Sequence, residues 1–344
     1  MSAELFHGGR LRQAAQHYAI PREQWLDLST GINPNGWPVP ALPPDSWRRL
    51  PEEGDGLEAA AAAYYGTEQL LPVAGSQAAI QLLPQLRPTS RVALLTPAYA
   101  EHARAWQAAG HQVSELASEA IAARLDEFEV VVVLNPNNPS GERFSQMQLR
   151  DWHARLAARR GWLVIDEAFI DATPQQSLAP QCGSDGLIVL RSLGKFFGLA
   201  GVRVGFLLAW PALLEAARLR LGPWSVSGPS REVARRALQD RGWQQAMRQQ
   251  LHAQTGRLQQ LLREHGLAPS GGSALFQWLR RDDALLWHEA LAQRAILTRP
   301  FAAPRALRFG LPGTEGEWQR LATALEEISS ALTHHKERRS CNAS

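Results

Sequence analysis

The sequence predicts an α/β fold, with a large, mainly parallel sheet between layers of helices and a smaller α+β part after it. From about residue 55 to residue 221, short β-rich runs alternate with helical stretches, which is the pattern of a parallel sheet. These runs are apolar throughout, as expected of strands buried on both faces. After Pro223 the pattern changes to long amphipathic helices and a few short strands, which predicts a second, smaller lobe.

The strands expected in the large part are 92–95, 130–134, 162–165, 187–190 and 202–208. Four of them lead into a polar or glycine-bearing loop, at 96–99, 135–139, 166–167 and 192–195. In an open α/β sheet, ligands bind at the carboxyl ends of the strands. We therefore expect these four loops to meet at one edge of the sheet and to form a site there.

The smaller part is expected to contain helices 230–239, 243–265, 284–294 and 315–332 and strands 274–279 and 306–309. The first forty residues are rich in proline and glycine and cannot form a core alone. We therefore divide the chain into an N-terminal segment, 1–44, that packs on the small domain, a large cofactor-binding domain, 45–225, and a small domain, 226–333. The remaining tail, 334–344, is expected to be disordered, as chain ends often are.

Composition excludes several classes of protein. The net charge of +3 comes from scattered arginines, which argues against a nucleic-acid partner. The two cysteines, Cys182 and Cys341, provide no disulfide framework and indicate a reducing, cytoplasmic location. No apolar run approaches the roughly 20 residues of a membrane span, and no signal pattern opens the chain. We expect a protein without membrane or metal sites.

Lysine usage is the most informative feature of the composition. The chain contains two lysines, Lys195 and Lys336, because arginine stands almost everywhere else that a positive charge is needed. An amine forms an imine with an aldehyde and a guanidinium does not, so a lysine kept inside the chain indicates chemistry. We predict that Lys195 holds pyridoxal 5′-phosphate (PLP) as a Schiff base.

A PLP site also needs an anion at the pyridine nitrogen, a donor to the ring oxygen and an aromatic face for stacking. Asp166, after strand 162–165, is the predicted anion, Asn138 the predicted donor and Tyr99 the predicted stacking ring. Each has a plainer interpretation as well. Asp166 is compatible with a helix cap, the Asn138 loop with an ordinary turn, and Tyr99 with a core aromatic.

The PLP phosphate requires main-chain donors at the start of a helix. Gly75, Ser76 and Gln77 open the helical run 78–86 and are predicted to supply these donors together with the positive end of the helix dipole. Ser192 and Arg203 would add a hydroxyl and a guanidinium. A dinucleotide or nucleoside triphosphate site is disfavoured, because neither G-x-G-x-x-G nor G-x-x-x-x-G-K-[ST] spacing occurs.

Taken in their order along the chain, these residues resemble the fold-type I aminotransferase superfamily. The resemblance is carried by Gly75-Ser76-Gln77, Tyr99, Asn138-Pro139-Ser140-Gly141, Asp166-Glu167-Ala168-Phe169, Ser192-x-x-Lys195 and Arg203. It implies the aminotransferase-like PLP fold, with a large α/β/α domain and a small α+β domain that hold the cofactor between them. It also implies a homodimer whose active sites lie near the subunit interface.

Four segments resemble the L-threonine O-3-phosphate decarboxylases of cobalamin biosynthesis more than the related histidinol-phosphate aminotransferases: 7–9 (His-Gly-Gly), 28–34, 166–171 and 223–226. The implied reaction is PLP-dependent decarboxylation of a small phosphorylated amino acid, L-threonine O-3-phosphate, to (R)-1-amino-2-propanol O-2-phosphate. Decarboxylation requires the carboxylate to stand perpendicular to the cofactor ring, so the residues that hold the substrate decide the reaction.

The same resemblance implies the substrate-binding residues. Contacts to the phosphorylated substrate fall on His7, Gly8, Gly31, Asn33 and Asn138. Arg308 is expected to clamp the carboxylate and Arg299 to be a second substrate-binding arginine, because a planar guanidinium suits both carboxylate and phosphate. Two surface arginines are the plainer interpretation of this last pair.

Three positions depart from the superfamily pattern: Gly31 stands where some relatives have asparagine, Leu50 where a tyrosine often reaches the partner's cofactor phosphate, and Phe169 where many aminotransferases have tyrosine.

Two other functions stay open. One is a histidinol-phosphate or aromatic aminotransferase, which would consume 2-oxoglutarate. The other is a PLP-binding regulator without catalysis, although the sequence contains no basic recognition helix.

Overall fold

The computed structural model describes residues 8–341, with side chains up to residue 332. The chain forms two units. The large unit contains residues 36–138 and 142–248, and the small unit contains the described residues before 36, residues 139–141 and those from 249 onward. The division falls within one helix, α10 (Arg241–Glu264), whereas we expected a boundary at 225/226.

Within the described residues, the large unit is built on a seven-stranded sheet of order β2-β8-β7-β6-β5-β3-β4. Strands β7, β6, β5, β3 and β4 are parallel, and β8 is antiparallel to both of its neighbours. The strands are β2 (Leu70–Val73), β3 (Arg91–Leu95), β4 (Gln112–Leu116), β5 (Val130–Leu134), β6 (Trp162–Asp166), β7 (Leu187–Ser192) and β8 (Gly205–Leu208). The predicted mainly parallel sheet is confirmed.

The strands that the sequence predicts best are those whose every residue is buried, β5, β6 and β7. The predicted strand 202–208 begins later, at Gly205, because Ala200–Val202 forms a short 3-10 helix. Two strands of this sheet escaped prediction. β4 is a polar edge strand of mixed exposure, and β2 contains Pro72, so neither is a continuous apolar run.

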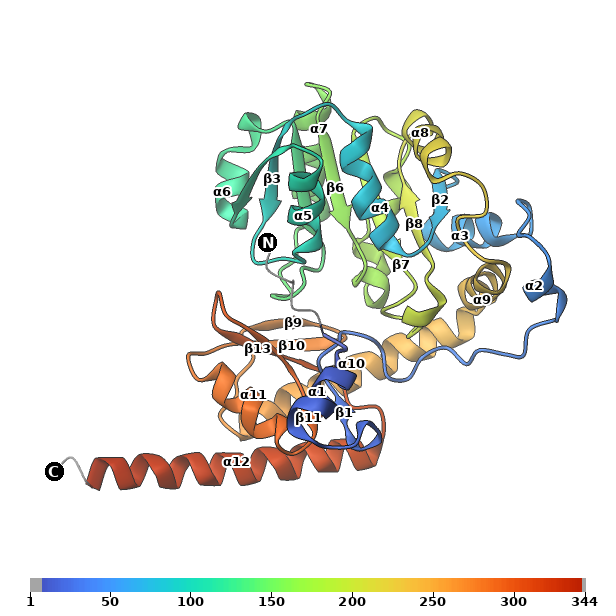
Figure 1. Cartoon of the computed structure of the whole chain (residues 1–344). Helices are drawn as coiled ribbons and strands as arrows, with labels where there is room; N and C mark the ends of the chain where they lie inside the picture. Colours follow the sequence, from blue (N-terminus) through green and yellow to red (C-terminus); the bar gives the residue numbers. More distant parts are fainter. Residues whose placement is uncertain (1–7, 342–344) are drawn as a thin grey trace. The chain divides into compact units, whose positions relative to one another are not determined.

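Helices cover both faces of this sheet (Figure 1). One face packs against α4 (Ser76–Leu82), α5 (Glu101–Ala108) and α8 (Pro211–Leu221) through a core that includes Ile80, Trp106 and Leu214. The opposite face packs against α3 (Leu57–Tyr65) and α7 (Gln146–Ala157). Shorter helices α2 (Asp45–Arg48) and α6 (Ser118–Ala123) and helix α9 (Gly228–Gln239) complete the regular helices described in this unit.

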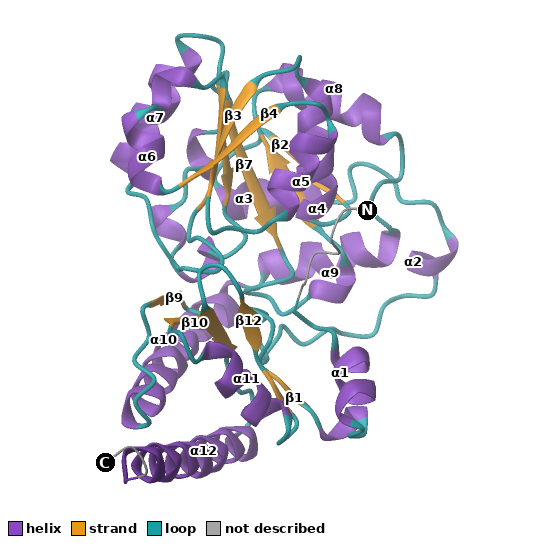
Figure 2. Cartoon of the chain, turned by 60° about the vertical axis from the view of Figure 1, so that its left-hand side comes forward, coloured by secondary structure: helices purple, strands orange, loops and turns teal. Residues whose placement is uncertain are grey.

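The small unit combines helices with short strands, as the predicted α+β character requires, and most of its strand pairs are antiparallel. Within its described residues a sheet of order β12-β13-β10-β9 lies against α10 and α11 (Figure 2). Its strands are β9 (Gly271–Ser273), β10 (Phe276–Arg280), β12 (Arg299–Phe301) and β13 (Ala306–Gly310), and β1 (Leu26–Asp27) pairs in parallel with β11 (Ile296–Leu297). The helices besides α10 are α1 (Leu11–Tyr18), α11 (Ala284–Ala292) and α12 (Glu315–Cys341).

Several details of the small unit differ from the sequence-based expectation, which did not include the short strands β1, β11 and β12. The expected strand 274–279 is a hairpin of β9 and β10, since Ser273 and Phe276 are paired across the turn. The backbone of the expected disordered tail is helical as far as Cys341, and residues 342–344 lie outside the described part. No helix of the described residues has the length and apolar character needed to cross a membrane, and no group of three or more potential metal ligands occurs among them.

Candidate active site

The carboxyl ends of three neighbouring strands of the large unit bring the predicted cofactor residues together. Asp166 is the last residue of β6 and Ser192 the last of β7, and Asp166 pairs with Leu190 in the parallel register. Asn138 follows β5 by four residues and is 9% exposed, while Lys195 follows Ser192 by three. The sequence-based expectation of one polar edge is therefore confirmed for these loops.

Asp166 is held rigidly. Its side chain is buried, and Oδ1 accepts a hydrogen bond of 3.0 Å from the main-chain N–H of Ala168. Oδ2 lies 3.0 Å from Nε2 of His102, a residue of α5 that is itself 1% exposed. Since a buried carboxylate is costly without partners, these two contacts keep the carboxylate in a fixed place.

His102 connects Asp166 to Tyr99, the predicted stacking ring. The Tyr99 hydroxyl donates to Oε1 of Gln77 at 3.1 Å, and the ring of Tyr99 lies edge-on to His102. The Gln77 amide in turn donates to Glu101 at 3.1 Å. On the other side, Nζ of Lys195 lies 5.5 Å from the ring centre of Phe169. The structure thus links Tyr99 to Gln77. It also places Lys195 beside Phe169, at the position where many aminotransferases have tyrosine.

The start of α4 forms a cradle that depends on glycine. Gly75 precedes this helix with φ of +74°, and a Cβ there would lie 2.6 Å from Nη2 of Arg203. A Cβ on Gly205, in β8, would lie 2.5 Å from the main-chain nitrogen of Ser76. Two glycines therefore allow a guanidinium and a neighbouring strand to approach main-chain N–H groups at a helix start, which is an arrangement suited to a phosphate.

In the small unit, Arg299 and Arg308 are directly opposite each other on β12 and β13. Arg308 is 2% exposed, and burial, with a smaller effect from the charge of Arg299, holds its pKa well below the usual value. Asp27 opposes this shift. Like charges directly opposite in a sheet repel, so this pair favours an anion between or beside the two guanidinium groups.

Ser29 connects Arg308 to the start of the described chain. Its carbonyl accepts a 2.7 Å hydrogen bond from Nη2 of Arg308, and its hydroxyl accepts a 2.8 Å bond from the N–H of Gly9. The hydroxyl donates to Asp27 at 2.6 Å. A Cβ on Gly8 would lie 2.3 Å from the Ser29 oxygen, so this close packing requires glycine there. The Gly8 backbone and Arg308 are thus anchored to one residue.

The other predicted substrate residues lie in the same unit or outside the described part. Gly31 and Asn33 are buried, and Oδ1 of Asn33 accepts from the N–H of Asn35 at 2.9 Å. His7 lies outside the described residues. The predicted cofactor residues all belong to the large unit: Gly75, Ser76, Gln77, Tyr99, Asn138, Asp166, Ser192, Lys195 and Arg203. The described substrate residues other than Asn138 belong to the small unit: Gly8, Gly31, Asn33, Arg299 and Arg308.

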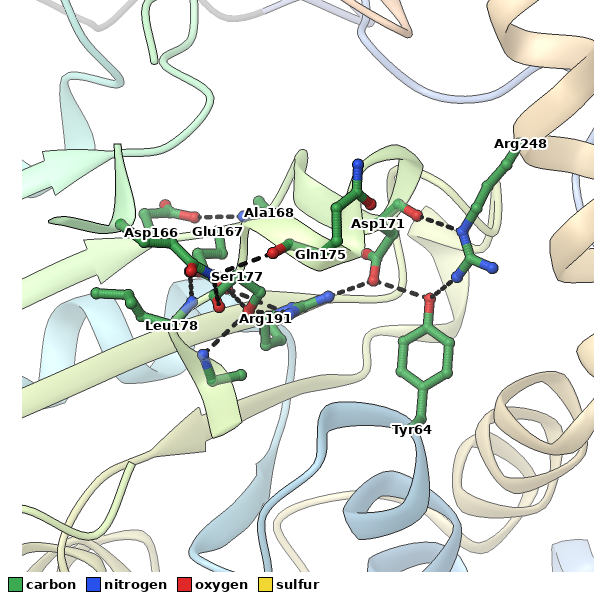
Figure 3. A network of polar contacts seen from close by, with 12 residues as sticks. Tyr64, Asp166, Glu167, Ala168, Asp171, Gln175, Ser177, Leu178, Arg191 and Arg248 are labelled. Atoms are coloured by element: carbon green, nitrogen blue, oxygen red, sulfur yellow. Dashed lines mark hydrogen bonds and ion pairs between the residues drawn. The ribbon is translucent and has the colours of Figure 1, made fainter. Parts of the chain in front are cut away.

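Two groups of buried residues around Asp166 were not predicted. His102 contacts the carboxylate directly, and its position three residues after Tyr99, one helical turn away, was the available signal. On the opposite face of the sheet lies a network around Arg191, Glu167 and Asp171 (Figure 3). Here the signal was a pair of charged residues, Glu167 and Arg191, beside otherwise apolar strands.

Comparisons with known proteins identify the family of the chain. Residues 52–325 match the family described as aminotransferase class I and II. The threonine-phosphate decarboxylase of Pseudomonas aeruginosa is 56% identical over 93% of this chain and 97% of its own, and that of a Sinorhizobium species is 43% identical over 95% and 99%. The fold matches the histidinol-phosphate aminotransferase of Sinorhizobium meliloti in complex with pyridoxal 5′-phosphate, with a TM-score of 0.79 over 96% of each chain at 21% identity. The chain therefore belongs to the class I and II aminotransferase family, as the order of its site residues predicted.

Proposed function

We propose that this chain is a PLP-dependent carboxy-lyase that decarboxylates L-threonine O-3-phosphate to (R)-1-amino-2-propanol O-2-phosphate in cobalamin biosynthesis. The observation that carries the proposal is the 56% identity to a threonine-phosphate decarboxylase over nearly the whole of both chains. The geometry of the large unit supports the cofactor, and the paired arginines of the small unit support an anionic substrate.

The residues present fit PLP. The cradle at Gly75 and Gly205 leaves room for a phosphate against main-chain donors, with the guanidinium of Arg203 beside it. Ser192, which ends the neighbouring strand, would add its hydroxyl. Charge-assisted hydrogen bonds of this kind are about twice as strong as neutral ones, so these donors are suited to hold a dianionic group.

At the other end of the cofactor, Asp166 would accept a hydrogen bond from the protonated pyridine nitrogen and keep that nitrogen protonated. Its carboxylate is already fixed by Ala168 and lies beside His102, so no reorganisation is needed when that charge forms. Asn138 would donate to the ring oxygen, and Tyr99 would cover a face of the ring. Because Phe169 carries no hydroxyl, the contact to the ring oxygen would rest mainly on Asn138.

When bound, PLP supplies an electron sink for the charge left on Cα when carbon dioxide departs. Lys195 would hold the cofactor through its amine, and as the free ammonium it would be the proton donor to Cα. Arg299 and Arg308 would bind the anionic groups of the substrate, with Gly8, Gly31 and Asn33 lining its phosphate. The orientation they impose would expose the carboxylate for loss and disfavour removal of the Cα hydrogen.

We also propose that the enzyme is a cytoplasmic homodimer. A reducing compartment agrees with Cys182, which is buried as a free thiol. Large apolar side chains of the large unit are exposed, among them Trp47, Leu50, Leu219 and Trp224. Exposed apolar groups of this size on one unit favour a surface that a second copy covers.

The test is a product assay with purified protein, PLP and L-threonine O-3-phosphate, run with and without 2-oxoglutarate. We expect carbon dioxide and aminopropanol phosphate in equal amounts, at a rate that 2-oxoglutarate does not change. Plain L-threonine should be a poor substrate, because it lacks the charge-assisted contacts of the phosphate. Formation of glutamate in step with a keto acid, without carbon dioxide, would replace this proposal by an aminotransferase.

A further inference from the structure

Five residues form a polar cluster on the face of the large sheet opposite to Asp166: Arg191, Glu167, Asp171, Ser177 and Tyr64, here called the buried cluster (Figure 3). Its three charged members are almost fully enclosed, with exposures of 2% for Arg191, 0% for Glu167 and 1% for Asp171. Charges removed from water are costly, and a buried ion network is on its own weak evidence for stability. The cluster therefore calls for an explanation beyond packing.

Arg191 is the centre of the buried cluster. Its Nη1 donates to Oε2 of Glu167 at 3.2 Å and to Oγ of Ser177 at 3.0 Å, and its Nη2 donates to Asp171. Its guanidinium also lies 4.5 Å from the ring centre of Tyr65, a residue of α3. One side chain from the end of β7 thus binds three separate points of the chain that follows β6.

The partners of Arg191 are held from further directions. Glu167 accepts from the N–H of Leu178 at 2.8 Å and from the Ser177 hydroxyl. Asp171 accepts from the Tyr64 hydroxyl at 2.9 Å, and its carbonyl accepts from Nε of Arg248 at 2.9 Å. The segment from Glu167 to Leu178 is therefore fastened to α3, to β7 and to the start of α10 around one guanidinium.

The register of the strands relates the buried cluster to the cofactor residues. Asp166 pairs with Leu190 and side chains alternate between faces, so Asp166 and Ser192 point to one face. Glu167 and Arg191 point to the opposite face. Each of these two cluster residues is the chain neighbour of a proposed cofactor contact, because Glu167 follows Asp166 and Arg191 precedes Ser192.

The spacing between Asp166 and Ser192 matters because PLP is rigid between its pyridine nitrogen and its phosphate-bearing carbon. Main-chain pairing ends near these residues, with the N–H of Glu167 bonded to the carbonyl of Leu190 at 2.9 Å. Beyond that bond, β6 and β7 lead into separate loops. The ion pairs of Arg191 then connect the end of β7 to the segment that follows β6. The planar guanidinium of Arg191, bonded to three acceptors, fixes both the distance and the relative orientation of these two segments. A single point charge would not fix the orientation.

We infer that Arg191 is a positioning residue for the cofactor: through the buried cluster it fixes the ends of β6 and β7, and so the distance between the groups that hold the pyridine nitrogen and the phosphate of PLP. This inference rests on the proposed PLP-dependent function. It explains why charged residues are buried here although their burial is unfavourable: they keep the site on the other face of the sheet in a precise geometry.

The test is Arg191→Lys in the purified holoenzyme, with PLP affinity and the visible absorption of bound PLP as readouts that need no substrate. Lysine keeps the charge but cannot satisfy Glu167, Asp171 and Ser177 in the same geometry. We expect the dissociation constant of PLP to rise about tenfold, the effect of one lost charge-assisted hydrogen bond, and the absorption of bound PLP and its pH midpoint to shift. The value of kcat should fall more than KM rises.

Ser177→Ala is the second variant. It keeps all three charges and removes only the hydroxyl that joins Arg191 to Glu167, so we expect a smaller change of the same sign in the same readouts. It decides the matter if Arg191→Lys does not fold. Arg91→Lys is the matched control, because Arg91 forms an ion pair with Glu129 at 2.5 Å at the exposed start of β3. That control should leave PLP affinity and absorption unchanged.

The inference is wrong if Arg191→Lys, or Ser177→Ala in its place, lowers the melting temperature but leaves PLP affinity, absorption and kcat as in the wild type. The buried cluster would then be a purely structural feature. Failure of the proposed function is distinguishable. Wild-type protein that takes up no PLP would overturn both, whereas protein that binds PLP but releases no carbon dioxide would overturn the substrate alone, and the binding readouts would still decide the role of Arg191.

Discussion

Individual residues of this chain carry chemistry because of where their neighbours hold them. Asp166 is an ordinary carboxylate until Ala168 and His102 fix both of its oxygens in a buried place. Lys195 lies near the ring of Phe169, in the loop that follows Ser192. In the small unit, Arg308 is buried, and its bond to the Ser29 carbonyl fixes the direction of its guanidinium.

The first prediction at this scale concerns the covalent link. Reduction of the holoenzyme with borohydride, followed by peptide mapping, should place the pyridoxyl label on Lys195, because the chain offers one other lysine, Lys336. The variant Lys195→Arg keeps a positive charge and should take no label, since a guanidinium does not form the imine. A label on Lys336, or on neither lysine, would contradict the cofactor assignment.

Strands and helices of the large unit bring together residues that are distant in the sequence. The parallel strands β5, β6 and β7 end at the same edge, so three loops that are distant in sequence deliver Asn138, Asp166 and Lys195 to one region. The start of α4 adds main-chain donors, and β8, running antiparallel, brings Gly205 and the nearby Arg203 up to that helix start. The phosphate cradle is thus a property of two elements packed closely together.

A prediction for the element scale is that Gly75→Ala weakens PLP binding. Alanine at this position would place its Cβ 2.6 Å from Arg203 Nη2, and the φ of +74° is strained for any residue with a side chain. The displaced guanidinium and the strain together should raise the dissociation constant of PLP by about tenfold or more.

The matched control for Gly75→Ala is Gly201→Ala. No atom lies within 4 Å of the position that a Cβ on Gly201 would occupy, so this variant should bind PLP like the wild type in the same fluorescence or absorbance titration. Equal PLP affinity of Gly75→Ala and wild type would mean that the phosphate is not held at the start of α4.

At the scale of the whole molecule, segments of the two units alternate along the sequence. Residues 139–141 belong to the small unit but lie between two stretches of the large one. A cut at one sequence position therefore does not separate them. In the large unit, Leu219 and Trp224, which are 75% and 59% exposed, line one groove of about 640 Å³ together with Pro51. Charged residues, among them Glu53 and Arg218, also line this groove, and exposed apolar side chains with polar neighbours are suited to contact with a second copy.

At this scale we expect the protein to be a dimer and the double variant Leu219→Glu, Trp224→Glu to shift it toward the monomer. Two charges placed in an apolar interface would each have to be desolvated, which disfavours association. Light scattering over a dilution series measures the mass, and Met147→Glu, a change at another exposed apolar residue, is the control. A wild-type protein that is monomeric at micromolar concentration would refute the dimer.

The sequence alone determined the fold class and the family, and it predicted which residues of the large unit form the candidate site. It could do so because buried parallel strands are continuous apolar runs and because the polar residues that end them, Asp166, Ser192 and Lys195, interrupt these runs visibly. Polar or proline-containing strands such as β4 and β2 were missed, since their stability comes from pairing with neighbours and leaves no local pattern.

Tertiary structure alone decided which distant residues meet. The contact of His102 with Asp166 joins residues 64 positions apart, and Arg191 reaches Glu167, Asp171 and Ser177, which precede it by 24, 20 and 14 positions. The bond from Arg308 to Ser29 spans 279 positions. Burial and electrostatics act through space, so a residue's sequence neighbours report its local conformation but not the charges that surround it after folding.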